Sequence, residues 1–76
     1  MARSTHAVPR YRVEERQRDL AAFIMGFADT RLQYEALVVL RTAQLTRARV
    51  HADLVVIEQD TETVILRRDV GTTPES

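Results

Sequence analysis

The chain has 76 residues, and its eleven acidic residues balance eleven basic residues, all of which are arginine. A chain of this length supports one domain at most, and it buries only about 60–65% of the surface that it exposes when unfolded. The absence of cysteine excludes disulfides and thiolate metal sites. Small domains usually gain stability from disulfides, a bound metal or association with another chain. Of these, the composition leaves association open.

The charge is unevenly spread along the chain. Residues 1–18 carry five arginines and two acids, a net charge of +3, whereas residues 19–76 carry a net charge of −3. The balanced total argues against a dedicated nucleic-acid coat protein, but the asymmetry is compatible with a basic arm. No apolar run approaches the ~20 residues that span a bilayer, and no secretory signal is visible, so we expect a cytoplasmic protein, or a virion- or phage-associated one if the gene is viral.

We expect residues 1–10 to form a flexible arm, because they lack any periodicity and include Pro9. A first helix is predicted from about residue 11 to residue 27. Its proposed face repeats at steps of four and three residues, which is the spacing of a helical seam. The face consists of Val13, Gln17, Leu20, Ile24 and Phe27, with Gln17 as its one polar member.

Residues 28–30 form the first break in the pattern. Thr30 followed by Gln33 matches the capping box, in which two side chains satisfy the first amides of a helix. A second helix is predicted over 31–57, and the short link makes the two helices an antiparallel hairpin. The fold expected first is therefore mostly α, with a short C-terminal element.

This second helix is apolar on two sides, so it needs cover from more than one direction. The first side comprises Leu32, Ala36, Val39, Ala43, Val50, Leu54 and Ile57. The second side comprises Leu37, Val38, Leu45, Ala48, Ala52, Val55 and Val56.

The alternative is an α+β fold with two helices and a β-hairpin at about 53–69, a segment rich in β-branched residues. The hairpin would oppose Ile57 with Val64, Val56 with Ile65, and Asp53 with Arg68. Its weak point is the turn at Asp60-Thr61, which offers no residue that readily adopts a positive φ. In either fold, residues 11–70 form one domain and residues 71–76 a polar tail.

The sequence offers little chemistry. Both serines, Ser4 and Ser76, are near the chain ends, and of the two histidines His6 lies in the arm and His51 in the second predicted helix, so no catalytic triad can be drawn. Glu58, Asp60 and Glu62 lie around the predicted turn but lack the calcium-loop pattern. We therefore predict no enzyme, no cofactor, no metal site and no small-molecule substrate.

The function expected first is a non-catalytic protein–protein interaction module, which self-associates or docks as a small helical subunit of a larger assembly. Its predicted partner interface consists of Leu37, Val38, Leu45, Ala48, Ala52 and Val55. The alternative is a small nucleic-acid-associated regulator. Its candidate phosphate contacts are Arg10, Arg12, Arg16 and Arg18.

Overall fold

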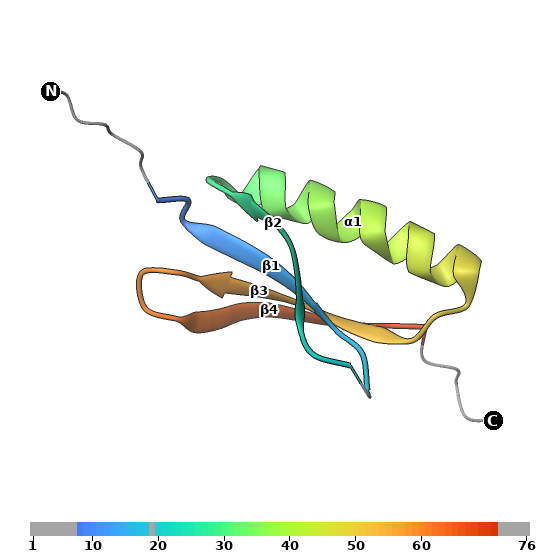
Figure 1. The fold of residues 1–76 in the computed structure, drawn as a ribbon. Coiled ribbons are helices and arrows are strands. Elements are labelled where there is room, and N and C mark those ends of the chain that lie inside the picture. The colour runs from blue at the N-terminus through green and yellow to red at the C-terminus, as the bar shows by residue number, and fades with distance from the viewer. Residues whose placement is uncertain (1–7, 19, 72–76) are drawn as a thin grey trace, which may run out of the picture.

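The computed structural model describes residues 8–18 and 20–71, and within these ranges the chain forms one helix and four strands. The strands make a single antiparallel sheet in the order β2-β1-β3-β4, and α1 lies along one face of it (Figure 1). The elements are β1 (Tyr11–Arg16), β2 (Phe23–Ala28), α1 (Arg31–Ala48), β3 (Ala52–Glu58) and β4 (Thr63–Val70).

The prediction of a mostly helical protein built on a helical hairpin is wrong. The segment predicted as the first helix, 11–27, is the hairpin of β1 and β2. β1 pairs on both sides, with β2 and with β3, so its backbone groups are satisfied by distant strands. Its alternation is that of a strand: Val13 belongs to the core beneath α1, whereas Arg12 and Glu14 lie on the opposite face.

The second predicted helix is real, but it ends at Ala48 and not at residue 57. Arg49 adopts a left-handed conformation with φ of 61°, and the Val50 amide donates to the Leu45 carbonyl. An end at this point keeps the acidic residues Asp53 and Glu58 away from the helix C-terminus, whose dipole they would oppose. The β-branched segment beyond it is β3.

The predicted cap at Thr30 is confirmed. The Gln33 amide donates to Thr30 Oγ1 at 3.2 Å, and the Gln33 side chain in turn accepts from the Asp29 amide at 2.7 Å. The first bond satisfies an amide that the first turn of a helix leaves without an internal partner, and the second ties the residue before the cap to that turn. The cap separates a strand from a helix, and not two helices.

Thr30→Ala should therefore destabilise the protein by about 1 kcal/mol, because it removes the acceptor of the Gln33 amide. For a domain of this size, that loss should lower the melting temperature by roughly 4–8 °C in a circular dichroism melt. Thr46→Ala is the control, since Thr46 is an exposed residue within the same helix. An increase in melting temperature for Thr30→Ala would contradict the capping role.

The alternative prediction of a β-hairpin at 53–69 is correct, and the α+β fold class fits the structure better than the mostly helical one. The structure differs from that alternative in having one helix and two hairpins, where two helices and one hairpin were predicted. Ile57 opposes Val64 as predicted, but a bulge next to Ile57 shifts the remaining pairs by one residue, so that Val56 opposes Leu66. The turn problem is solved by Glu62, which takes the positive φ, 55°, that Asp60-Thr61 could not readily supply.

The core lies between α1 and the sheet. From the helix it receives Tyr34, Val38 and Leu45, each at most 8% exposed, and Tyr34 packs edge-on against Tyr11 with ring centroids 4.8 Å apart. The sheet contributes the buried residues Val13, Ala28, Ala52, Leu54, Val56 and Val70. The sheet thus covers only one of the two apolar sides of α1.

Most of the predicted arm and tail, residues 1–7 and 72–76, lies outside the described residues. Where the described chain begins, Gln59 holds it to the β3–β4 turn: its amide donates to the Arg10 carbonyl and its side chain donates to the Pro9 carbonyl, both at 2.8 Å. At the other end, Gly71 has φ of +81°, and a Cβ there would meet the Val50 carbonyl oxygen at 2.6 Å. Only glycine fits that position without strain.

Candidate interaction surface

The side of α1 turned away from the core carries large apolar side chains in the open. Leu32 is 77% exposed, Val39 is 63% exposed and Leu40 is 59% exposed. Ala36 and Ala43 are exposed between them. These residues recur at steps of three and four, so they form one stripe along the helix. Apart from Leu40, this stripe belongs to the first of the two apolar sides described in the sequence analysis, and the sheet leaves it uncovered.

β2 adds a second apolar element beside this stripe. It is an edge strand of the sheet, and its sequence, FIMGFA, contains neither charge nor proline. Phe23, Ile24 and Phe27 are between 48% and 62% exposed. Natural edge strands are usually protected by charge, proline or cover, because their open backbone groups pair readily with another chain. β2 lacks the first two of these protections.

Two hollows of about 540 and 420 Å³ lie between α1 and β2, and a third of about 460 Å³ adjoins them along α1. Leu40 lines all three. We call them together the α1–β2 groove. Asp29 lines the hollow nearest the start of the helix, and Arg47 lines the hollow nearest its end. Between these two residues the groove is lined mainly by apolar residues, namely Phe23, Met25, Phe27, Ala36, Leu37, Leu40 and Ala43, and its polar members are Gln33, Gln44 and Arg41, which is paired with Glu15.

The six residues predicted as a partner interface are dispersed in the structure. Leu37 and Ala48 line the α1–β2 groove. Val38 and Leu45 are 2% exposed, in the core beneath the helix. The strand residues Ala52 and Val55 are each 1% exposed, and Val55 lies between Glu14 and Arg67 on the sheet face opposite α1.

Sequence reasoning missed Phe23, Ile24, Phe27 and Leu40 as surface residues. It assigned Ile24 and Phe27 to the buried face of a helix, because their spacing fits a helical repeat. A different signal was present: residues 20–28 contain no charge, which is unusual for an exposed edge of a small protein. That signal indicates a surface only once the segment is known to be an edge strand.

Of the candidate phosphate contacts, Arg12 and Arg16 lie within β1 and are already paired, whereas Arg10 and Arg18 lie beyond opposite ends of that strand. Arg12 bonds Glu14 at 2.8 Å and Glu62 at 3.0 Å, and Arg16 bonds Glu14 at 3.0 Å. Burial raises the pKa of Glu14, but hydrogen bonds from Arg12 and Arg16 outweigh burial and hold that pKa below its ordinary value. Arg10 lies over the ring of Tyr11, and Arg18 lines a polar pocket.

Since carboxylates already neutralise Arg12 and Arg16, we expect no appreciable binding of DNA or RNA at physiological salt, about 0.15 M. The measurement is fluorescence anisotropy with labelled duplex DNA and single-stranded RNA over a salt series. The matched variant changes Arg10, Arg12, Arg16 and Arg18 to Gln. Salt-sensitive binding by the wild type that this variant loses would contradict the expectation and favour the nucleic-acid alternative.

A second charged contact joins α1 to β1 beneath the helix. Arg41 Nε lies 2.6 Å from Glu15 Oε1, and a second Arg41 nitrogen lies 3.2 Å from Oε2. Glu15 is 3% exposed, whereas the Arg41 side chain is 34% exposed. The hydrogen bond from Arg41 holds the pKa of Glu15 below its ordinary value, against the opposing effect of burial. This two-point contact orients α1 on the sheet.

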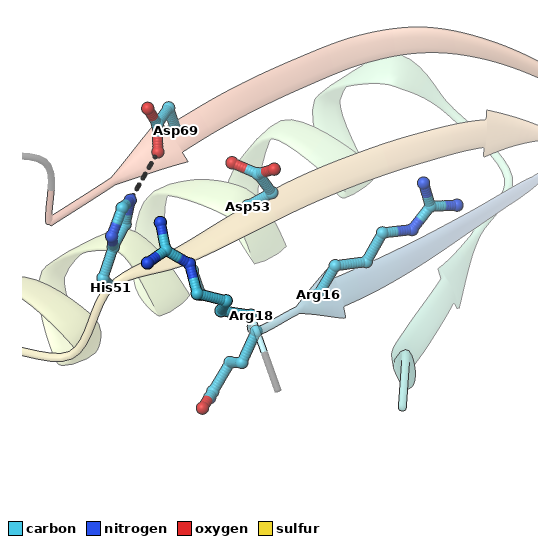
Figure 2. Close-up of a pocket in the computed structure, with 7 residues that line it drawn as sticks. Arg16, Arg18, His51, Asp53 and Asp69 are labelled. Atoms are coloured by element: carbon cyan, nitrogen blue, oxygen red, sulfur yellow. Dashed lines mark hydrogen bonds and ion pairs between the residues drawn. The ribbon is translucent and has the colours of Figure 1, made fainter. Parts of the chain in front are cut away.

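A polar pocket of about 620 Å³ lies at the end of β1, between the start of β3 and the end of β4. His51 Nε2 is 3.0 Å from Asp69 Oδ1, and both side chains are more than half exposed. Figure 2 shows Arg18 extending towards His51, while the guanidinium of Arg16 points away from it. Among the described residues, no serine, threonine or cysteine lines this pocket.

Across residues 8–18 and 20–71, no group of three or more histidines and acids is arranged to hold a metal ion. In the same part of the chain, no helix has both the length and the apolar character needed to cross a membrane.

Comparisons with known proteins identify no relative of this chain. None of the protein-family models matches it, and neither a curated protein nor a solved structure does. The function has to be inferred from the surface itself.

Proposed function

We propose that the protein is a non-catalytic interaction module of the cytoplasm that self-associates through the α1–β2 groove. The observation that carries the proposal is the exposure of Leu40, Phe23 and Phe27, at 59%, 62% and 50%, around two adjoining hollows that both include Leu40. Large apolar side chains gathered in one place, and not scattered singly, are typical of a surface that meets another protein.

The energetics favour association of moderate strength. Burying a half-exposed leucine, valine or phenylalanine contributes roughly 1 kcal/mol. About five such side chains on each of two copies therefore contribute about 10 kcal/mol, which is comparable to the estimated 4–15 kcal/mol cost of joining two chains. Because the two terms are so close, one charge placed in the groove should suffice to prevent association.

Leu40→Lys should therefore convert an associated chain into a monomer without unfolding it. Leu40 is 59% exposed and lines every part of the groove, and lysine is a good helix former. The measurement is molar mass by light scattering over a dilution series, with circular dichroism to verify the fold.

The control for this experiment is Ile65→Lys, which places the same charge at a 41% exposed position on β4, away from the groove. We expect Ile65→Lys to associate like the wild type. The proposal would be refuted by a wild type that is monomeric at every concentration, or by two variants that associate equally well.

A further inference from the structure

We infer that a second copy of this chain docks by antiparallel pairing of its β2 with β2 of the first copy. The two four-stranded sheets then become one continuous sheet, with both copies of α1 on the same face. This inference rests on the proposed self-association and specifies its geometry. It combines strand addition with helix packing, two of the recurring ways in which proteins associate.

The choice of edge follows from the sequences of the two edge strands. β4 carries Arg67, Arg68 and Asp69, and charges of this kind keep an edge from pairing with another chain. β2 carries no charge along its six residues. β2 is therefore the edge that can accept a strand, although a bulge between Gly26 and Ile24 interrupts its pairing with β1, and its phenylalanines add exposed apolar area to the contact.

The symmetry of such a pairing accounts for the position of the groove. When two identical edge strands pair antiparallel, a two-fold axis passes through the sheet at right angles, and the same surface is used twice. The two helices then lie antiparallel on one face of the joined sheet. Since the α1–β2 groove lies on the β2 side of α1, the grooves of the two copies face each other across the axis.

The charges of the groove are complementary under this rotation, which is the reason for choosing a second copy as the occupant. Asp29 lies at one end of the groove and Arg47 lies at the other. A two-fold axis brings the acidic end of each copy to the basic end of its partner, while the apolar middle packs against itself. Complementary charges of this kind set the register of an interface.

The first test locates the strand that pairs. The chain has no cysteine, so a single introduced cysteine reports on one position alone. Ile24→Cys and Val64→Cys are matched, because the two side chains are 48% and 50% exposed on β2 and β4. Phe23→Cys and Phe27→Cys cover the other exposed positions of β2, since a disulfide forms only where two Cα atoms lie within about 7 Å.

Under mild oxidation, at least one β2 cysteine should give a disulfide-linked dimer in high yield, and Val64→Cys should not. Non-reducing electrophoresis at a concentration where the wild type is dimeric measures this. Cross-linking through Val64→Cys alone, in a dimeric wild type, would overturn the β2 pairing and leave self-association standing.

The second test uses the charges. Asp29→Arg places arginines at both ends of the groove, and Arg47→Asp places aspartates at both ends. Each variant alone should associate at least tenfold more weakly than the wild type. Mixed in equal amounts, the two should form a heterodimer of twice the chain mass, since both of its contacts then join opposite charges.

The readouts separate the two proposals. A wild type that is monomeric at every concentration overturns both the self-association and its geometry. A dimeric wild type whose two charge variants associate no better together than apart overturns the two-fold arrangement only. Circular dichroism melts of each variant verify that weak association is not caused by unfolding.

Discussion

Leu45→Glu is expected to leave the chain largely unfolded at 25 °C. Leu45 is 2% exposed and lies in the core between α1 and the sheet. The substitution removes a buried leucine side chain, which alone costs about 2–5 kcal/mol, and it adds a charge without a partner. Since a domain of this size has only about 3–5 kcal/mol of stability, the loss exceeds what the fold can absorb. Far-ultraviolet circular dichroism and a urea titration measure the outcome.

The matched control is Ala43→Glu, two residues away on the exposed side of the same helix. It should remain folded and weaken self-association, because Ala43 lines the α1–β2 groove. The pair of variants separates folding from association. A Leu45→Glu chain that stays folded but becomes monomeric would show that Leu45 meets a partner, as the sequence analysis proposed, and would contradict the core described above.

Arg41→Leu is expected to destabilise the protein by about 3 kcal/mol at pH 7. It leaves the Glu15 carboxylate buried without its cation, and breaking a buried pair from one side costs about 3–5 kcal/mol. We expect the lower end of that range, because Arg41 is 34% exposed and Gln17 also donates to Glu15. Urea titrations across pH 4–7 measure the free energy of unfolding.

The effect should shrink as the pH falls, and its sign follows from the pKa of Glu15. In the wild type that pKa lies below its ordinary value of 4.5, so the contribution of the pair is present above pH 4.5 and is lost in more acidic solution. Without Arg41, burial raises the pKa of Glu15. The folded variant then binds a proton more readily than the unfolded chain, so acid should stabilise the variant relative to the wild type.

A control replaces both members of the pair. Glu15→Leu with Arg41→Leu should recover most of the stability lost by Arg41→Leu, because no buried charge remains without a partner. Because the double variant lacks the Glu15 carboxyl, protonation of that group cannot stabilise it in acid as it stabilises Arg41→Leu. If the single and double variants were equally unstable, the loss would come from the packing of the Arg41 stem and not from the stranded carboxylate.

What the sequence by itself determined are the features that depend on near neighbours. The cap at Thr30 and Gln33 is one, since the side chain and the amide that it satisfies are three residues apart. The pairing of Ile57 with Val64 is another, because a short turn brings the two strands together. The two apolar sides of α1 are a third, since helical periodicity alone displays them.

Only the tertiary structure decided the conformation of residues 11–28. Val13, Ile24 and Phe27 fit a helical repeat, and Val13 fits a strand alternation as well, so local pattern could not choose. Val13 pairs with Val56 on one side and Gly26 on the other, and the first of these contacts joins distant parts of the chain. Hydrogen bonds to a remote strand override helix propensity, and a local pattern carries no information about that strand.

The same distant pairing decided the candidate site. The sequence shows that α1 is apolar on two sides, but not which side the sheet will cover. Because the sheet covers the side with Val38 and Leu45, the side with Val39 and Leu40 is left in solvent. Because β1 takes β3 as its second neighbour, β2 remains at the edge beside that stripe. An interaction surface built from a strand edge and a helix face exists only after the sheet order is set, since neither element contains it alone.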